Sequence, residues 1–337
     1  MNFKLKIALL IIISAFVIVL CIGVGSAYIS PKDIFSILLH RSFGAPLPGE
    51  LPEAYVPLVL DMRIPRVLSS YLTGAALSMS GAVMQSLLQN PLASPYGLGV
   101  SAGAGLGAAF AIVSGLSLAI PLISLAFALL TILAVSGISS RLDRSFSNTT
   151  IILIGMVVSL FCTAIMSLAA SYNPDFAQRI QLFTLGSFSM KEWSAVLTLI
   201  PAAAAAFVVF MYFSREADMM SFGDSQAATM GVNAPLMKKI LMLTAAALTG
   251  VAVSLVGIIG FVDLVVPHVA RKLTGASARR VLPVCALLGG IFLTLCDLAA
   301  RTLALPREIP IGVITALLGA PFFIYIFFIM KKKRRTG

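Results

Sequence analysis

Apolar runs long enough to cross a membrane alternate with short polar segments along the chain. A transmembrane helix needs about 20 consecutive, mostly apolar residues. Runs of this kind predict spans near residues 7–28, 67–88, 96–114, 118–138, 150–170, 193–213, 281–300 and 310–330. Lipid therefore surrounds most of the predicted structure.

One further run, residues 240–270, is too long for a single span. It has 31 residues and one charge, Asp263, and a straight helix of that length would overshoot the hydrocarbon core. Gly257, Gly260 and Pro267 offer breaks, so we predict two elements, 240–257 and a short 259–271. The pattern predicts an all-α polytopic membrane protein of about ten transmembrane helices in a single domain, residues 1–337.

Composition and charge agree with a membrane protein. The chain is 59% hydrophobic and 11% charged, whereas an average soluble domain is about a quarter charged. The net charge of +11 could indicate nucleic acid, but no aromatic-basic RNA motif is present, and basic cytoplasmic loops are the usual cause in membrane proteins. We expect no nucleic-acid partner.

The distribution of basic residues predicts the orientation. With ten spans and a cytoplasmic N-terminus, 16 of the 24 Lys and Arg residues lie inside and 8 outside, and the KKKRR tail (residues 331–335) is inside. Cytoplasmic loops are enriched in Lys and Arg, so both termini are predicted to be cytoplasmic. Residues 1–27 could also be read as a cleaved signal peptide, but the apolar run is longer than a signal core, which favours a retained first span.

Three arginines lie on the predicted outer side, against the general trend. Arg63 and Arg66 stand about one helical turn apart in RIPRVLSS (63–70), and Arg301 ends the ninth span. One arginine could simply extend its charge to the interface. Three at one face of a chain with few charges suggest a partner that carries carboxylates.

The longest inner loop, residues 214–239, contains DSQAATMG, which reads as a brief helix. Asp224 or Ser225 could cap its start, Ala227 and Ala228 favour helix, and Gly231 would close it. A small apolar helix on the cytoplasmic surface is either a docking element or a plain connector, and this spacing alone does not separate the two.

Motifs for catalysis are missing from the sequence. It contains no GxxxxGK[ST], HExxH or GxSxG, and its four scattered cysteines have no metal-ligand spacing. Three polar residues remain within apolar segments: Asp263, His268 and Asp297. An acidic group at membrane depth is costly and often functional, so a proton relay is one interpretation and a structural hydrogen bond to neighbouring backbone is the other.

The segments that remain resemble one family over nearly the whole chain. They include RIPRVLSSYLTGAALSMSGAVMQSLLQNPLASPYGLGVSAGAGLGA (63–108), LFTLGSFS (182–189), GIIGFVDLVVPHVARKLTGASARRVLPVCALLGG (257–290), CDLAART (296–302) and EIPIGVITALLGAPFFIYI (308–326). These segments are similar to the permease subunits of type II ABC importers, which take up cobalamin, haem and ferric siderophores. One departure is Asp263, at a position where glycine is common in that family.

The resemblance implies partners and site residues. It implies two permease copies in a homodimer, two cytoplasmic ATPase subunits, and a periplasmic or lipid-anchored substrate-binding protein, with no cofactor on this chain. The positions that correspond to the family's functional residues are Arg63, Arg66 and Arg301 for docking of the binding protein, Asn148 and Thr149 for a cytoplasmic gate, and Asp224, Ser225, Gln226, Ala227, Ala228 and Gly231 for coupling to the ATPase within the loop 214–239.

Three functions are therefore weighed. The first is the permease of an ATP-driven importer in a bacterial or archaeal cytoplasmic membrane, for an iron-siderophore, haem or cobalamin-type substrate. The second is a proton-coupled secondary transporter that uses Asp263 and Asp297; such transporters tend to contain internal repeats, and we find no convincing one. The third, an intramembrane enzyme that uses His268, would need a convergent set of polar groups.

Overall fold

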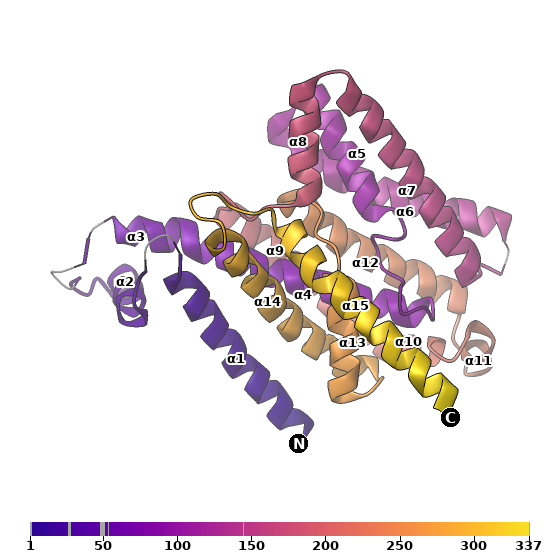
Figure 1. Ribbon diagram of the computed structural model, residues 1–337. Helices are drawn as coiled ribbons and strands as arrows, with labels where there is room; N and C mark the ends of the chain where they lie inside the picture. Colours follow the sequence, from indigo (N-terminus) through magenta and orange to yellow (C-terminus); the bar gives the residue numbers. More distant parts are fainter. Residues whose placement is uncertain (1, 26–27, 48–50, 53, 144, 337) are drawn as a thin grey trace.

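The computed structural model describes residues 2–25, 28–47, 51–52, 54–143 and 145–336, with the backbone alone described for residues 325–336. In this part of the chain all regular structure is helical (Figure 1). The helices are α1 (Phe3–Gly23), α2 (Pro31–Phe43), α3 (Tyr55–Pro57), the π-helix η1 (Leu58–Arg63), α4 (Ile64–Leu87), α5 (Val100–Val113), the 3-10 turn η2 (Ser117–Ala119), α6 (Ile120–Leu142), α7 (Asn148–Ser171), α8 (Pro174–Leu185), α9 (Trp193–Tyr212), α10 (Ser214–Met220), α11 (Asp224–Thr229), α12 (Ala234–Val256), α13 (Val262–Thr274), α14 (Ala278–Thr302) and α15 (Ile311–Thr336).

Helix α4 is the centre of the bundle. Nearly all of its residues are buried, and α14, α12, α13 and α9 pack around it. Its contact with α14 is close because Gly74 of α4 faces Gly289 of α14, where an added Cβ would lie well under 3.0 Å from the opposing backbone. Small residues allow helix backbones to approach closely in lipid, and here they join the two helices that carry the outer arginines.

Helices α5, α6, α7 and α8 form a second group beside this centre (Figure 1). Gly103 and Gly107, four residues apart in α5, allow this helix to approach α6 closely. A Cβ at Gly103 would collide with Thr131 of α6, and one at Gly107 would crowd the Ile123 carbonyl of the same helix. Gly99, with φ of 87°, instead marks the start of α5.

The long apolar run of residues 240–270 is broken as predicted. Helix α12 ends at Val256, Gly257 has φ of 81°, and α13 begins at Val262. Helix α12 starts earlier than expected, at Ala234, because Asn233 caps it through a hydrogen bond from the Leu236 N–H. The break therefore produces one long helix and one short helix.

Seven helical stretches of the described residues are long and apolar enough to cross a membrane: α1, α4 together with α3 and η1, α6 with η2, α7, α9, α12 and α14. The three other predicted spans coincide with α5, α13 and α15, which are shorter or less apolar within the described side chains. Two helices that the apolar pattern missed, α2 and α8, lie in predicted outer loops. The protein is thus a multi-pass, all-helical membrane protein, and the count of ten spans stays a prediction.

Candidate functional site

The outer arginines come together at the end of α1. Arg63 Nη1 donates to the carbonyl oxygens of Ile22 (2.8 Å) and Gly23 (3.0 Å), and Arg301 Nη2 donates to that of Cys21. These are the last residues of α1, whose carbonyls lack partners within the helix. Cations are favourable at a helix C-terminus, so two buried arginines cap α1 and hold it against α4 and α14.

Arg66 has a different role at the same end. Its guanidinium binds the buried Asp297 of α14 through Nε and Nη2, at 2.8–3.2 Å, and binds Glu308 through Nη1 and Nη2, at 2.8 and 3.1 Å. Arg301 Nε lies 3.8 Å from Asp297 Oδ2. A planar guanidinium between two carboxylates fixes orientation as well as charge, which links α4, α14 and the segment that precedes α15.

The three arginines therefore do not extend together into solvent. Arg63 and Arg301 are buried, and the side chain of Arg66 is 13% exposed, whereas that of Glu308 is 41% exposed. The π-helical turn η1 ends at Arg63, and Arg63 turns to α1 while Arg66 turns to α14. Sequence reasoning missed Glu308 because nothing in its spacing links it to Arg66, 242 residues away.

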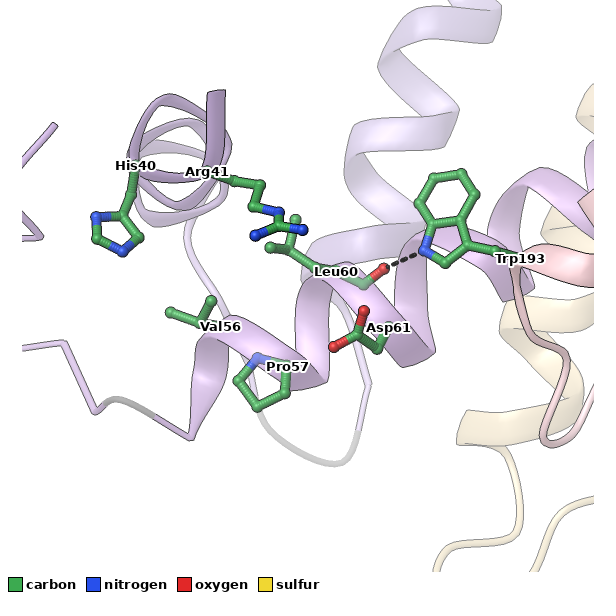
Figure 2. Close-up of a pocket in the computed structure, with 7 residues that line it drawn as sticks. All are labelled: His40, Arg41, Val56, Pro57, Leu60, Asp61 and Trp193. Atoms are coloured by element: carbon green, nitrogen blue, oxygen red, sulfur yellow. Dashed lines mark hydrogen bonds between the residues drawn. The ribbon is translucent and has the colours of Figure 1, made fainter. Parts of the chain in front are cut away.

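Two cavities open at this cluster. One of about 500 Å³ is lined by Arg63, Arg66, Arg301 and Glu308 together with residues 189–192, and a neighbour of about 290 Å³ shares Arg66 and Glu308 with it. Figure 2 shows a separate cavity of about 590 Å³ between α2, η1 and α9, where Arg41 and Asp61 lie toward Trp193 and His40 lies on the opposite side. Trp193 Nε1 donates to the Leu60 carbonyl at 3.0 Å, which ties α9 to η1 (Figure 2).

The predicted gate residues lie at the first turn of α7. Ser147 caps this helix by accepting a hydrogen bond from the Thr150 N–H, and Asn148 and Thr149 follow. Thr149 is exposed, and Asn148 Oδ1 is buried without a hydrogen-bond partner. Hydrogen bonds from Ser145 and Ser147 lower the pKa of the Asp143 carboxyl just before this turn. A polar, uncharged helix start is therefore held in place by its preceding loop.

The loop 214–239 contains the brief helix that the sequence predicted. Helix α11 ends as expected: Gly231, with φ of 86°, donates to the Ala228 carbonyl, and Val232 donates to that of Ala227. The predicted cap is wrong, however, because the helix begins at Asp224 itself and Gly223 occupies the cap position with no side-chain hydrogen bond. Asp224 instead pairs with Lys238.

Helix α11 leaves most of its surface open. Ala227 is buried, while Ser225, Gln226 and Ala228 are exposed. Two large apolar side chains beside the helix, Phe222 and Met230, are also exposed. A surface of this kind is suited to contact with another protein.

The polar residues at membrane depth do not form one site. Asp297 pairs with Arg66, whereas Asp263 lies in the first turn of α13, with the Ser94 hydroxyl and the N–H of Leu264 close to its carboxylate. Asp263 Oδ2 and His268 Nε2 are buried without hydrogen-bond partners. The structure thus places the two carboxylates in separate surroundings, and among the described residues no group of three His, Cys, Asp or Glu could hold a metal ion.

Comparison with known proteins agrees with this architecture. The model of the FecCD transport family matches residues 10–329. An uncharacterized ABC transporter permease of Bacillus subtilis is 40% identical over 92% of this chain and 89% of its own length. The Fe(3+)-citrate import permease of the same organism is 35% identical, over 96% and 94% of the two chains, and the vitamin B12 import permease of Yersinia enterocolitica is 37% identical, over 80% and 81%.

A solved structure is similar over nearly the full length. It is an inward-facing conformation of an ABC transporter assigned to the metal-chelate type, with a TM-score of 0.85 and 27% identity over 96% of this chain and 99% of the other. The likeness therefore extends to the whole helical arrangement and is not confined to a few segments.

Proposed function

The chain belongs to the FecCD transport family, and we propose that it is the membrane-spanning subunit of an ATP-driven importer for an iron-siderophore, haem or cobalamin-type substrate. The observation that carries this proposal is the likeness over almost the full length to permeases with such substrates, in sequence and in helix arrangement. The membrane is then the cytoplasmic membrane of a bacterium or archaeon, with both termini inside.

The complete importer contains further chains. The proposal includes a second copy of this permease, two cytoplasmic ATPase subunits and a binding protein on the outer side. The exposed surface of α11, formed by Ser225, Gln226 and Ala228, supports an ATPase contact. Asn148 and Thr149, at the start of α7, are proposed to form the cytoplasmic gate because they are polar and uncharged and one of them is exposed.

Docking of the binding protein is proposed at the arginine cluster of the outer end, Arg63, Arg66 and Arg301. Arg66 supports this best, because its guanidinium is partly exposed and its outer partner, Glu308, is solvent-accessible. A carboxylate of the binding protein can replace the Glu308 carboxylate as the ion-pair partner of Arg66. Arg63 and Arg301 are buried against α1 and act on this contact through the position of that helix.

Reconstitution tests the proposal. The permease is purified together with its ATPase and its binding protein and placed in liposomes, and uptake of a ferric siderophore, haem and cobalamin is measured. We expect uptake of one substrate class that requires ATP and persists when an ionophore abolishes the proton gradient, and no ATP hydrolysis by the permease alone. Uptake that follows the proton gradient without ATP would favour the secondary transporter based on Asp263 and Asp297.

A further inference from the structure

Lys238 is a fully buried charged residue in a chain that otherwise keeps its lysines mostly at the surface. It lies in the second turn of α12, with a side chain that is 1% exposed. Its ammonium group pairs with the carboxylate of Asp224 in α11 and also donates to the carbonyl oxygen of Phe146, at 3.0 Å. One side chain thus joins the exposed helix α11, the long helix α12 and the loop before α7.

The backbone conformation of Phe146 depends on contacts such as this one. It is a buried, non-glycine residue with φ of 52°, in the left-handed region that L-residues rarely adopt. A conformation of this kind persists only when surrounding contacts hold it. Here Lys238 binds the Phe146 carbonyl, the Phe146 N–H donates to the Asp143 carbonyl, and the Lys239 ammonium lies 5.6 Å from the centre of the Phe146 ring.

The residues after Phe146 start α7. Ser147 caps the helix, and Asn148 and Thr149 follow directly. Because two peptide bonds separate the Phe146 carbonyl from Asn148, a displacement of that carbonyl moves the first turn of α7. Asp224 lies at the other end of the contact, in the first turn of the helix with the exposed surface.

We propose that Lys238 is a positioning residue that transmits movement of α11 to the start of α7 through the chain Asp224, Lys238 and the Phe146 carbonyl. The proposal rests on the function proposed above, because it takes α11 as the ATPase contact and the start of α7 as the gate. Displacement of α11 pulls on Lys238 through the ion pair, and Lys238 pulls on the Phe146 carbonyl.

Other contacts of the same loop lead elsewhere. Asp218 of α10 accepts hydrogen bonds from Ser277 and from the Ala278 N–H at the start of α14, and the Met220 carbonyl accepts one from the Gln89 side chain. These bonds fasten α10 to the bundle. Among the hydrogen bonds and ion pairs of the described residues, the path from α11 to the loop before α7 runs through Lys238.

A contribution to folding stability does not explain why a charged lysine is buried at position 238. Replacing a buried ion pair with apolar side chains of similar volume is often neutral or stabilising, whereas removing the charge from one partner leaves the other uncompensated. Asp224 is one-third exposed and can be solvated when its partner is lost. Lys238→Met should therefore leave the chain folded while it breaks the connection.

The test uses the complete reconstituted importer and compares wild type with Lys238→Met. We expect the variant to assemble, to keep its thermal midpoint and to hydrolyse ATP, but to transport about tenfold less substrate per ATP. We expect maleimide labelling of Thr149→Cys to depend on nucleotide in the wild-type background and to lose that dependence with Lys238→Met. Lys272→Met, which removes an exposed lysine of α13, is the matched control and should behave as wild type.

The outcomes separate this proposal from the proposed function. An unchanged ratio of substrate to ATP, with normal nucleotide-dependent labelling, would overturn the role of Lys238 while ATP-driven import stands. If Lys238→Met does not fold, Asp224→Ala provides the second arm, because it removes the carboxylate that pairs with Lys238 and so breaks the connection at α11; full coupling in that variant would also overturn the role. Absence of ATP-driven uptake by wild type would instead contradict the proposed function.

Discussion

The carboxylate of Asp297 balances two cations within a few ångströms. It lies 2.8 Å from Arg66 Nη2 and 3.8 Å from Arg301 Nε, and its side chain is 2% exposed. Removing one partner of a buried ion pair costs about 3–5 kcal/mol, because the remaining charge is left without compensation. Asp297→Asn should therefore lower the thermal midpoint of the purified permease strongly and loosen the end of α1.

Glu308→Gln is the matched control for Asp297→Asn. Both replacements remove one carboxylate from Arg66, but Glu308 is 41% exposed, and exposed ion pairs contribute about 0–1 kcal/mol. A fluorescence-monitored melt of each variant makes the comparison. Equal shifts of the thermal midpoint for the two variants would show that burial of Asp297 does not determine its contribution to stability.

For the same cluster, the sequence predicts which arginines matter but not the groups that they all bind. The three arginines could be found because basic residues at an apolar helix end on the outer side break a general trend. The partners of Arg63 and Arg301 could not, because Cys21, Ile22 and Gly23 contribute backbone carbonyls, which carry no sequence signal. Lys238 was hidden for a related reason, since beside Lys239 it reads as an ordinary basic loop residue.

At the scale of elements, the contact between α4 and α14 depends on two glycines. A Cβ at Gly289 would lie well under 3.0 Å from the Gly74 carbonyl oxygen and from the Ser78 side chain. Overfilling a well-packed contact costs about 1–3 kcal/mol. Gly289→Ala should lower the thermal midpoint of the permease and reduce the folded yield.

Gly137→Ala is the control for Gly289→Ala. Gly137 also lies within a transmembrane helix, α6, but a Cβ there would meet no atom within 4 Å. Alanine has the higher helix propensity, by about 1 kcal/mol, so this variant should be neutral or slightly stabilised. Destabilisation of both variants to the same degree would contradict the role of packing between α4 and α14.

The apolar pattern predicted where the helices lie in the sequence better than it predicted which helices pack against each other. Every predicted span coincides with a helix, and the break after Val256 was predicted from Gly257. Helices α2 and α8 were missed because their polar residues interrupt the apolar runs used to find spans. The pairing of Gly74 with Gly289 could not be predicted, because glycine spacing in one helix does not say which helix it meets.

At the scale of the whole molecule, the number of membrane crossings decides on which side each terminus lies. The seven long apolar helices alone would place the two termini on opposite sides, whereas ten crossings place both on one side. Figure 1 shows the start of α1 and the end of α15 at the same end of the bundle. Lys6 near the start of α1 also donates to the Leu273 carbonyl at the end of α13, and Arg279 and Arg280 follow in the first turn of α14.

Ten crossings, which include α5, α13 and α15, therefore stay the prediction to be tested. Cells are stripped of their outer membrane or cell wall while the cytoplasmic membrane stays intact. We expect an epitope tag at either terminus to be inaccessible to protease in these cells and to be cleaved once the cytoplasmic membrane is opened. Ser225→Cys, in α11, should be labelled by an impermeant maleimide only in opened membranes, and Ser42→Cys, in α2, already in intact ones. Both are exposed positions, so accessibility differs only by side. A tag that is protected at one terminus and cleaved at the other in intact cells would show an odd number of crossings and would contradict the count of ten.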